Sequence, residues 1–588
     1  MQTRSAKFDF NIEITLTGSK NSQISQTSSY STHILNLIEI KIFMKCALII
    51  CPYLTNGGYP PLGVAYLNSV LKSNKYDVDV FDFQFLFQYE NHKLYNLLKK
   101  LVNIASGETQ VTFITNPEFV AYSLFSAEYP DFDWQITENE EYRDECIYLH
   151  SELKSYVNRY AKMVLKENPD IVFFSTYISN ILFSLMLAKE LKRRHPEIPV
   201  IFGGPGSALK ETAEFILSLK FVNGVIIGEG EETVIELLTE FKKTKKINPK
   251  IMGLATLSGR QLKYKSRPLI KNLDGIPYPD FDGFPLKNFT LKYYQKNWKY
   301  ELRSLFFDRF LLPVQSSRGC IMRCKFCSES AFWHSFRTRN VKSLANEIEF
   351  QVGKYDINNI SFNSSLLNSD KKWYENFLDS LEKQRVNIKW WSYLRPSEDL
   401  SKDVVKKMVS SGCEFVSIGV ESFSQKVLNK MGKETRAKKI FEILKCLNDA
   451  KIYVDITLLT GFPVKSDEIE ENLRFLKKWK RYIENKKNYV FINAWGLLRL
   501  EPQSRIFHNY EGFGIKIHRN PIRIPKEMSF LGLSLSKISL TWETPYETLE
   551  EKYQKRDTMI NYIKNDLPQC LLHHRFGVKR FREVVGME

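Results

Sequence analysis

The stretch SSRGCIMRCKFCSES, residues 316–330, holds three of the nine cysteines of the chain. Cys320, Cys324 and Cys327 follow a C-x-x-x-C-x-x-C spacing, and no fourth cysteine stands close behind them. Three thiolates can supply three of the four ligands of a tetrahedral zinc ion, or three corners of an iron–sulfur cubane. A structural zinc site needs a fourth Cys or His, and His334 does not complete the usual paired pattern. A [4Fe–4S] cluster with three protein ligands instead leaves one iron open for a substrate or cofactor.

The cysteine loop opens a regular alternation of strands and helices over residues 311–512. The expected strands include LLPVQSSRGC, ISFNSSLL, IKWWSYLRP, FVSIGVES, YVDITLLTGFP and YVFINAWGLL, with amphipathic helices between them. Five or six such units predict most of a (β/α) barrel rather than a full one. Cys320 follows the first strand, at the carboxyl end where such barrels carry their chemistry.

A second alternation precedes the barrel, over residues 44–258. It begins at the apolar run CALIICP and predicts an open parallel sheet covered by helices on both faces. Such sheets bind ligands at the carboxyl ends of their strands, which here carry PYLTNGGYPPLG, STYIS, GGPGS and GEGEE. None of these turns is a G-x-G-x-x-G, so a nicotinamide or flavin site is not predicted. Four glycine or polar turns on one sheet edge favour a large flat ligand.

Three segments lie outside the two alternations, and the overall composition indicates which partners and location to expect. Residues 1–43 are a polar extension to which no function is assigned, 259–310 form a connector, and 513–588 are expected to be a small helical region. A net charge of +17 arises from lysines spread along the chain, which indicates a solvated surface rather than a nucleic-acid partner. No membrane segment or secretion signal is recognised, and the scattered cysteines indicate a reducing, cytoplasmic location.

The motif RGCIMRCKFCSE resembles the C-x-x-x-C-aromatic-C loop of the radical S-adenosylmethionine (SAM) superfamily. The resemblance implies that Cys320, Cys324 and Cys327 bind a [4Fe–4S] cluster and that SAM chelates the open iron. Electron transfer from the reduced cluster would cleave SAM to methionine and a 5′-deoxyadenosyl radical. Phe326 would shield the cluster, and a reductant such as flavodoxin or ferredoxin would be a partner.

Two further motifs resemble SAM-binding parts of that superfamily. SIGVES resembles the fourth-strand motif, which makes Glu421 a candidate for hydrogen bonds to the ribose or amino group. LLTGFP resembles the turn that lines the adenosine pocket, around Thr460, Gly461 and Pro463.

Three further candidates for SAM contacts lie in segments that match the superfamily less closely. Arg395 in WWSYLRP could grip a carboxylate through two hydrogen bonds, although a surface arginine before a proline fits equally well. Where the superfamily often has an acidic residue on the second strand, this chain has FNSSLL. Asn363 and Ser364 could accept hydrogen bonds there, but they do not complement the charge of the SAM amine.

The front domain resembles the cobalamin-binding domain that precedes the barrel in one branch of the superfamily. The matching segments are PPLGVAYL, IFGGPGS, IIGEGEETVIELL and the connector LDGIPYPDFD. The resemblance implies a Rossmann-like cobalamin-binding sheet followed by a partial (β/α)6 TIM-like barrel. No D-x-H-x-x-G motif occurs, so cobalamin is expected base-off, without a histidine ligand. The candidate cobalamin contacts are Pro61, Gly63, Ser175, Gly203, Gly204, Gly228, Glu229 and Gly230.

The function implied by both resemblances is cobalamin-dependent C-methylation of an unactivated carbon in a peptide or natural product. A rearrangement or cyclisation enzyme with the same cofactors, but without methylation, stays open. A tRNA methylthiotransferase would carry a second three-cysteine cluster, and Cys46, Cys51 and Cys146 lack that spacing. A zinc-loop scaffold or cobalamin carrier without catalysis is the remaining alternative.

Overall fold

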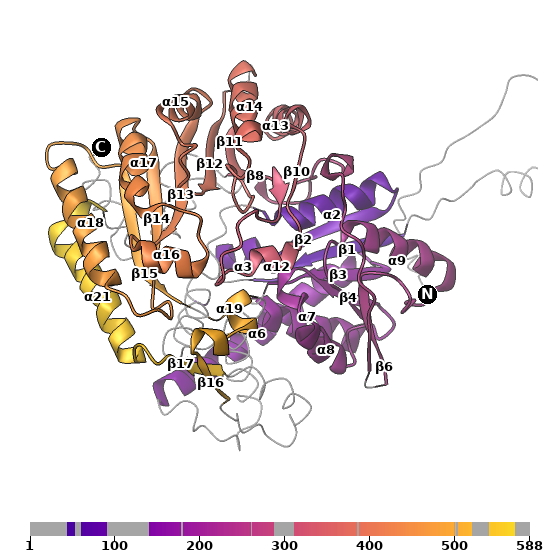
Figure 1. Cartoon of the computed structure of the whole chain (residues 1–588). Helices are drawn as coiled ribbons and strands as arrows, with labels where there is room; N and C mark the ends of the chain where they lie inside the picture. Colours follow the sequence, from indigo (N-terminus) through magenta and orange to yellow (C-terminus); the bar gives the residue numbers. More distant parts are fainter. Residues whose placement is uncertain are drawn as a thin grey trace, which may run out of the picture.

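The computed structural model describes residues 44–52, 60–90, 94, 140–177, 180–259, 261–286, 311–384, 387–498, 500, 504–519 and 540–570. The longer parts of the sequence outside this description are residues 1–43, 53–59, 95–139, 287–310, 520–539 and 571–588. Two α/β domains stand side by side (Figure 1), with the front domain in indigo and magenta and the barrel in salmon and orange. Within the described ranges, no helix has the length and apolarity that a membrane span requires.

The front domain is built on a seven-stranded sheet with the order β2-β1-β3-β4-β5-β6-β7. Its first five strands pair in parallel, as expected, whereas β6 and β7 pair antiparallel at one edge. β7 carries the sheet past residue 258, the expected end of the domain. The strands are β1 (Lys45–Ile50), β2 (Asp77–Asp82), β3 (Ile171–Ser175), β4 (Val200–Gly203), β5 (Gly224–Ile226), β6 (Leu254–Ser258) and β7 (Gln261–Lys263).

Helices cover both faces of this sheet, because its central strands are apolar along their whole length. β1 and β3 are almost entirely buried, which is the pattern of a parallel strand enclosed from both sides. α2 packs beside α9, and α6 beside α7. The helices are α2 (Leu62–Ser73), α3 (Phe83–Glu90), α6 (Glu140–Lys166), α7 (Ile181–Arg194), α8 (Lys210–Ser218) and α9 (Glu231–Thr244), with a 3-10 turn η3 (Pro205–Ser207).

The described half of the connector is clamped between the two domains. It contains the 3-10 turn η4 (Leu273–Gly275) and then the segment PYPDFD. The side-chain amide of Asn68 in α2 donates to the backbone oxygens of Asp280 and Asp282, at 3.0 and 3.1 Å. Lys72 pairs with Asp280 at 3.0 Å, and Lys354 of the barrel helix α13 (Val341–Tyr355) pairs with Asp282 at 2.9 Å. The connector thus fastens α2 to α13.

The second domain is a six-stranded, all-parallel sheet with the order β15-β14-β13-β12-β11-β8, which confirms the partial (β/α)6 barrel. Residues along β14 alternate between buried and half-buried, as expected when one face meets the helices and the other a lumen. The strands are β8 (Leu312–Val314), β11 (Asn359–Phe362), β12 (Lys389–Leu394), β13 (Cys413–Glu421), β14 (Tyr453–Thr460) and β15 (Val490–Leu497). The other helices are α12 (Glu329–Trp333), α14 (Lys371–Lys383), α15 (Lys402–Ser410), α16 (Gln425–Met431), α17 (Ala437–Asp449) and α18 (Glu468–Ile483).

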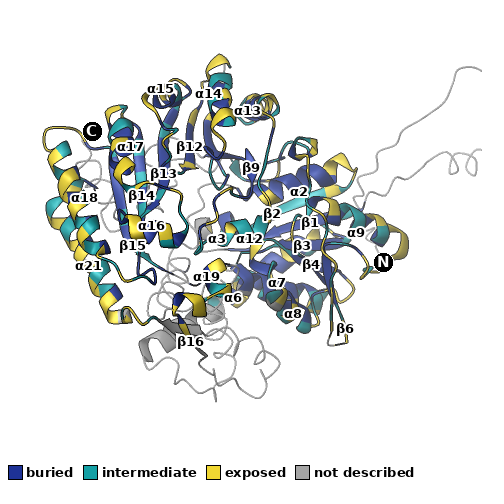
Figure 2. Cartoon of the chain, viewed as in Figure 1, coloured by how far each residue is buried: buried dark blue, intermediate teal, exposed yellow. Residues whose placement is uncertain are grey.

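The C-terminal region is helical in part. α21 (Leu549–Asp566) packs against β15 and α18, and its exposed face forms the outer edge of the molecule (Figure 2). The short helix α19 (Arg505–His508) and the 3-10 turns η6 (Glu511–Phe513) and η8 (Pro568–Cys570) complete the helical elements. An antiparallel pair, β16 (Lys516–Arg519) and β17 (Leu540–Glu543), was not expected.

Candidate active site

The cysteine loop leaves the barrel through a short strand pair. β9 (Ser317–Arg318) pairs antiparallel with β10 (Arg337–Thr338), so the loop between them is closed at its base. Gly319 follows β9 with φ of 84°, and a Cβ there would collide with the backbone oxygen of Ser335. Only glycine adopts this conformation without strain, which explains the Gly before the first cysteine.

The three cysteines lie together in this loop as free thiols. Cys324 is buried, and Cys320 and Cys327 are half-buried. Burial raises the pKa of Cys320 and of Cys327 to about 11, and it also raises the pKa of Cys324. The charge of each thiolate would act on at least one of the others, because the three lie close together. Metal binding would have to displace their protons.

A single metal ion and an iron–sulfur cluster need different arrangements of donors. Among the residues that the structure describes, no group of three or more His, Cys, Asp or Glu side chains is gathered to hold one metal ion. A structural zinc needs all its ligands on one atom, about 2.3 Å from each sulfur. The thiolates of a cubane each bind a different iron and therefore need not converge.

Apolar packing holds one side of the loop. Phe326 packs against a cluster that includes Met431 of α16 and Phe462 in the turn after β14. The backbone N–H of Lys325 donates to the oxygen of Met431 at 2.8 Å, and that of Ile506 in α19 donates to the oxygen of Lys325 at 2.8 Å. These contacts fix Phe326 in the loop, and its role as a shield of the cluster stays a prediction.

Glu421 ends β13 beside a lysine that the sequence did not single out. Its φ is 67°, and the pairing of β13 with β14 shifts register between Gly419 and Glu421. Lys433 donates to Glu421 at 3.1 Å, and Thr457 lies 3.5 Å from the other carboxylate oxygen. The positive charge of Lys433 also acts on Cys320 and Cys324. The pair thus lies between the barrel mouth and the cysteine loop.

The turn after β14 has features of a binding surface. The hydroxyl of Thr460 is buried and has no hydrogen-bond partner among the described residues. Gly461 has φ of 84°, and a Cβ there would lie 3.0 Å from the side chain of Lys552 in α21. Burial lowers the pKa of Lys552 to about 8. The C-terminal helix therefore packs directly on the candidate adenosine turn.

Arg395 lies next to the cysteine loop and is not a surface arginine. It is half-buried, with Nη1 3.9 Å from the sulfur of Met322 and Nη2 3.5 Å from a carboxylate oxygen of Asp399. Its Nε donates to the backbone oxygen of Asn368 at 3.4 Å. These contacts place the guanidinium between the cysteine loop and the end of β12.

Asn363 and Ser364 have different surroundings. The hydroxyl oxygen of Ser364 accepts hydrogen bonds from the backbone N–H groups of Ser316 and Ser317, at 3.0 and 3.1 Å. Ser364 therefore anchors the start of the cysteine loop. Asn363 accepts a hydrogen bond from Ser361 at 2.7 Å and lines a cavity between the domains.

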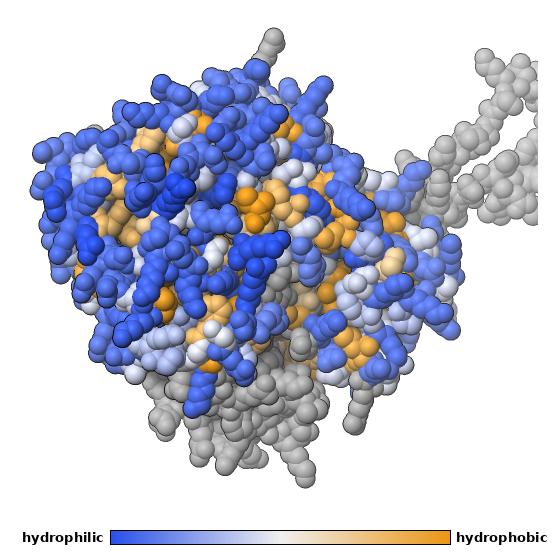
Figure 3. All heavy atoms as spheres, in the orientation of Figure 1, coloured by the Kyte–Doolittle hydropathy of each residue, from blue (hydrophilic) through white to orange (hydrophobic). Residues whose placement is uncertain are grey.

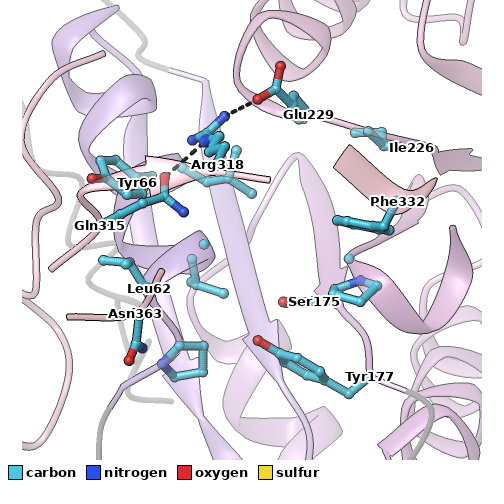
Figure 4. A pocket seen from close by; sticks show the side chains of 18 of the residues that line it. Leu62, Tyr66, Ser175, Tyr177, Ile226, Glu229, Gln315, Arg318, Phe332 and Asn363 are labelled. Carbon is cyan, nitrogen blue, oxygen red and sulfur yellow. Dashed lines mark hydrogen bonds and ion pairs between the residues drawn. The ribbon is translucent and has the colours of Figure 1, made fainter. Parts of the chain in front are cut away.

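That cavity has a volume of about 670 Å³ and extends from the carboxyl edge of the front sheet to the barrel lumen. Aromatic side chains from both domains form part of its wall, among them Tyr66, Tyr177 and Phe332, which Figure 4 labels, and Trp333. On the face shown in Figure 3, hydrophilic side chains dominate and apolar ones gather near the middle, between the domains. The candidate cobalamin contacts that line the cavity are Pro61, Gly63, Ser175, Gly203, Gly204, Gly228, Glu229 and Gly230.

The glycine turns form a close cradle along one side of the cavity. Gly204 has φ of 94°, and a Cβ there would lie 2.6 Å from the backbone oxygen of Thr176. Gly228 has φ of 95° with open space where a side chain would be. The lining residues that the structure describes include no histidine, cysteine or methionine. The cradle fits a large ligand that approaches the backbone closely.

Glu229 is held by the second domain. It accepts hydrogen bonds from Arg318 at 2.6 Å, from Arg337 at 2.9 Å and from the backbone N–H of Ile270 at 2.8 Å. Burial alone would raise the pKa of Glu229, but the hydrogen bonds from Arg337 and Arg318 outweigh burial and lower it. Glu229 therefore joins the domains while it lines the cavity. No pattern in the sequence predicted Arg318 and Arg337 as partners of Glu229.

Comparison with known families agrees with this geometry. Residues 314–476 match the radical SAM superfamily, and residues 135–238 match the B12 binding domain. The two domains implied by the cysteine motif and by the glycine turns are therefore confirmed.

Individual relatives are similar over parts of the chain. An uncharacterized methyltransferase of Pyrococcus horikoshii is 28% identical over 54% of this chain and 66% of its own length. The anaerobic magnesium-protoporphyrin IX monomethyl ester cyclase of Cereibacter sphaeroides is 22% identical over 66% of this chain and 60% of its own length. The chain thus spans about two thirds or less of these curated relatives.

One solved structure is similar over nearly the whole chain. It is the radical SAM methyltransferase TsrM from Kitasatospora setae, with cobalamin and a [4Fe–4S] cluster bound. The TM-score is 0.58 at 15% identity, covering 89% of this chain and 92% of TsrM. At this identity the likeness concerns the fold.

Proposed function

We propose that this chain, a B12 binding domain joined to a radical SAM domain, is a cobalamin-dependent radical SAM methyltransferase. The observation that carries the proposal is the single cavity shared by the glycine turns of the front sheet and the lumen of the barrel. Two cofactors that act on one substrate need such a common space. Arg318, at the base of the cysteine loop, forms part of the cavity wall.

In the barrel, Cys320, Cys324 and Cys327 would hold a [4Fe–4S] cluster. When bound, a reduced cluster supplies the electron that cleaves SAM to methionine and a 5′-deoxyadenosyl radical. The apolar packing around Phe326 covers one side of the loop. Glu421, fixed by its 3.1 Å contact with Lys433, offers a carboxylate oxygen to the hydroxyl or amino groups of SAM.

The turn after β14 would take the adenosine part of SAM. The buried hydroxyl of Thr460 can hydrogen-bond to a ligand, and Gly461 supplies the positive φ that the turn needs. Arg395, beside Met322, would meet the carboxylate of SAM.

In the front domain, the turns at Gly203, Gly204, Gly228 and Gly230 would hold cobalamin, which when bound carries the methyl group. Tyr66 and Trp333 offer flat apolar surfaces on the cavity wall. We expect no histidine ligand to the cobalt.

The reaction would replace a hydrogen on an unactivated substrate carbon with a methyl group. The hydrogen leaves in 5′-deoxyadenosine, and the methyl group originates from a second SAM. In the barrel half of the cavity, Asn363, Ser417, Asp455 and Asn493 supply polar groups that can orient a substrate. A peptide side chain or a natural-product intermediate fits such a space. A rearrangement or cyclisation that uses both cofactors without methylation is the alternative.

Cofactor retention in a cavity-filling variant tests the proposal. Gly63 lines the cavity, and nothing lies within 4 Å of a Cβ added there, so Gly63→Leu should fold. After anaerobic reconstitution with iron, sulfide and hydroxocobalamin, we expect wild type to retain both cofactors and Gly63→Leu to retain iron alone. The matched control is Gly353→Leu, an exposed glycine of α13 with the same open surroundings.

Three outcomes would contradict the proposal. If wild type forms 5′-deoxyadenosine but retains no cobalamin, the methyltransferase assignment fails. If Gly63→Leu retains cobalamin as wild type does, the cavity is not the cobalamin site. If wild type retains zinc and no iron, the cysteine loop is a zinc site.

A further inference from the structure

A buried group of charges joins the cysteine loop to the front sheet. Arg318, two residues before Cys320, is 4% exposed and donates to Glu229 at 2.6 Å and to Glu231 at 2.5 Å. Its Nε donates to Gln315 at 2.8 Å, and Figure 4 shows this contact together with that to Glu229. With the contact to Glu231, all three guanidinium nitrogens are engaged. Both glutamates belong to the turn GEGEE, which also supplies Gly228 and Gly230 to the cavity.

A second arginine completes the group from the other end of the loop. Arg337 faces Arg318 across the β9–β10 pair. It donates to both carboxylate oxygens of Glu229, at 2.9 and 3.0 Å, and to the backbone oxygen of Ile270 at 2.6 Å. Like charges directly opposite on paired strands repel each other. Here the carboxylate of Glu229 contacts both Arg318 and Arg337 and offsets that repulsion. The glutamate of the front sheet therefore holds the base of the cysteine loop closed.

The geometry of this group is rigid for physical reasons. A guanidinium presents its donors in a fixed plane, so two carboxylates that share it are fixed relative to each other. The ring of Tyr66 lies 5.8 Å from the Arg318 guanidinium and that of Trp333 lies 5.6 Å away, which leaves the arginine little freedom. Buried charges also resist separation, because breaking one pair leaves the other partner unpaired.

We infer that Arg318, Glu229 and Glu231 act as a positioning clamp, which fixes the distance between the cysteine loop and the glycine turns. The inference rests on the proposed function, since the clamp matters only when a cluster and cobalamin occupy the two sides. Misplacement of reacting groups by about 1 Å can cost on the order of 10²-fold in rate. Arg318 is thus a positioning residue.

The test is the distance between the two cofactors in the reconstituted full chain. Pulsed electron paramagnetic resonance measures the dipolar coupling between cob(II)alamin and the reduced cluster. We expect a narrow distance distribution in wild type. Arg318→Lys keeps the buried charge but loses the planar fork, and Glu231→Gln removes one carboxylate. Both variants should bind iron and cobalamin as wild type does, with a shifted or broadened distribution.

The second measurement is methyl transfer from SAM to reduced cobalamin, which should fall on the order of 10²-fold in both variants. The matched control is Glu232→Gln in the same helical turn, because Glu232 is 55% exposed and pairs with Arg267 at 3.3 Å. It should give the wild-type distance and rate. A higher SAM concentration should restore neither the distance distribution nor the transfer rate of the two variants, because the clamp does not control SAM binding.

Two results would overturn the inference. A wild-type distance distribution in both Arg318→Lys and Glu231→Gln would show that the clamp does not set the spacing. Loss of iron or of cobalamin from these variants would show that the residues bind a cofactor instead. If wild type itself retains no cobalamin, the proposed function fails and the clamp has no role in transfer.

Discussion

At the scale of single residues, Gly319 decides the direction in which the cysteine loop leaves the barrel. Its φ of 84° turns the chain between Arg318, which is held by the front domain, and Cys320. The oxygen of Ser335 lies where a side chain would begin. The cysteine loop and the Arg318 contacts with the front domain therefore meet at one residue without a side chain.

We predict that Gly319→Ala disturbs this loop. The added methyl group would collide with the Ser335 oxygen in a conformation that costs on the order of 1–3 kcal/mol for a residue with a side chain. The free energy of unfolding and the iron content after reconstitution should both fall. Gly353→Ala in the exposed face of α13 is the control and should stabilise the chain by about 1 kcal/mol. Unchanged iron content in Gly319→Ala would contradict this account.

Glu468 at the start of α18 gives a prediction of pH dependence. Burial raises its pKa to about 7 from an ordinary value of 4.5, despite a 2.7 Å hydrogen bond from the Ser422 hydroxyl. A raised pKa means that the folded chain binds the proton more tightly than the unfolded chain. Its contribution to stability is therefore full below about pH 4.5 and lost as pH rises through 7.

Glu468→Gln removes this dependence, since an amide resembles the protonated acid. Urea unfolding should show little difference at pH 5, and a variant more stable by on the order of 3 kcal/mol at pH 8. Glu470→Gln, on the exposed face of the same turn, should show no such gain. Equal stability of wild type and Glu468→Gln at both pH values would refute the assignment of a buried neutral acid.

Sequence alone could identify the cysteines because their spacing is local, but not the partners of Glu229. Those partners, Arg318 and Arg337, lie 89 and 108 residues further along the chain. A glutamate after a glycine turn looks the same whether it meets a ligand or an arginine. Lys433 was missed for the same reason, because only the fold brings it to Glu421.

At the scale of secondary-structure elements, α13 connects the barrel to the front domain at both of its ends. At its start, the backbone N–H of Asn340 donates to Asp274 in the connector at 2.9 Å. At its end, Lys354 pairs with Asp282. The helix is therefore part of the joint between the domains.

Asn340→Ala should weaken this helix. The Asn340 side chain accepts hydrogen bonds from the backbone N–H groups of Lys342 and Ser343, at 2.9 and 3.4 Å. Loss of such a cap costs about 1 kcal/mol, which urea unfolding would register as a lower midpoint. Asn340→Asp keeps the acceptor and should unfold as wild type does. A midpoint for Asn340→Ala equal to that of wild type would mean that the cap contributes nothing.

Strand and helix alternation predicted most elements, because apolar runs and helical spacing are read from neighbouring residues. The antiparallel pairs β6–β7 and β16–β17 were not predicted. The strands of both pairs are short, and LATLS and QLK lack the long apolar runs of the parallel strands. Whether such short segments form strands depends on the parts of the fold that they pack against.

At the scale of the whole molecule, the two domains share one cavity, and their buried apolar residues form one continuous core. The connector, α13 and the Arg318 clamp fix the carboxyl edge of the front sheet against the barrel. The resemblance of the two halves to known domains predicted this pairing. It did not predict that a buried ion-pair group would close the joint, since that depends on the relative placement of the halves.

Formation of 5′-deoxyadenosine tests the central claim most directly. Reconstituted chain, SAM and a strong reductant are incubated without oxygen, and the product is quantified by chromatography. Wild type should form 5′-deoxyadenosine, and Cys324→Ala should form none. Cys446→Ala, which removes a half-buried cysteine of α17, should match wild type. Product from Cys324→Ala at the wild-type level would contradict the claim that this loop holds the cluster that cleaves SAM.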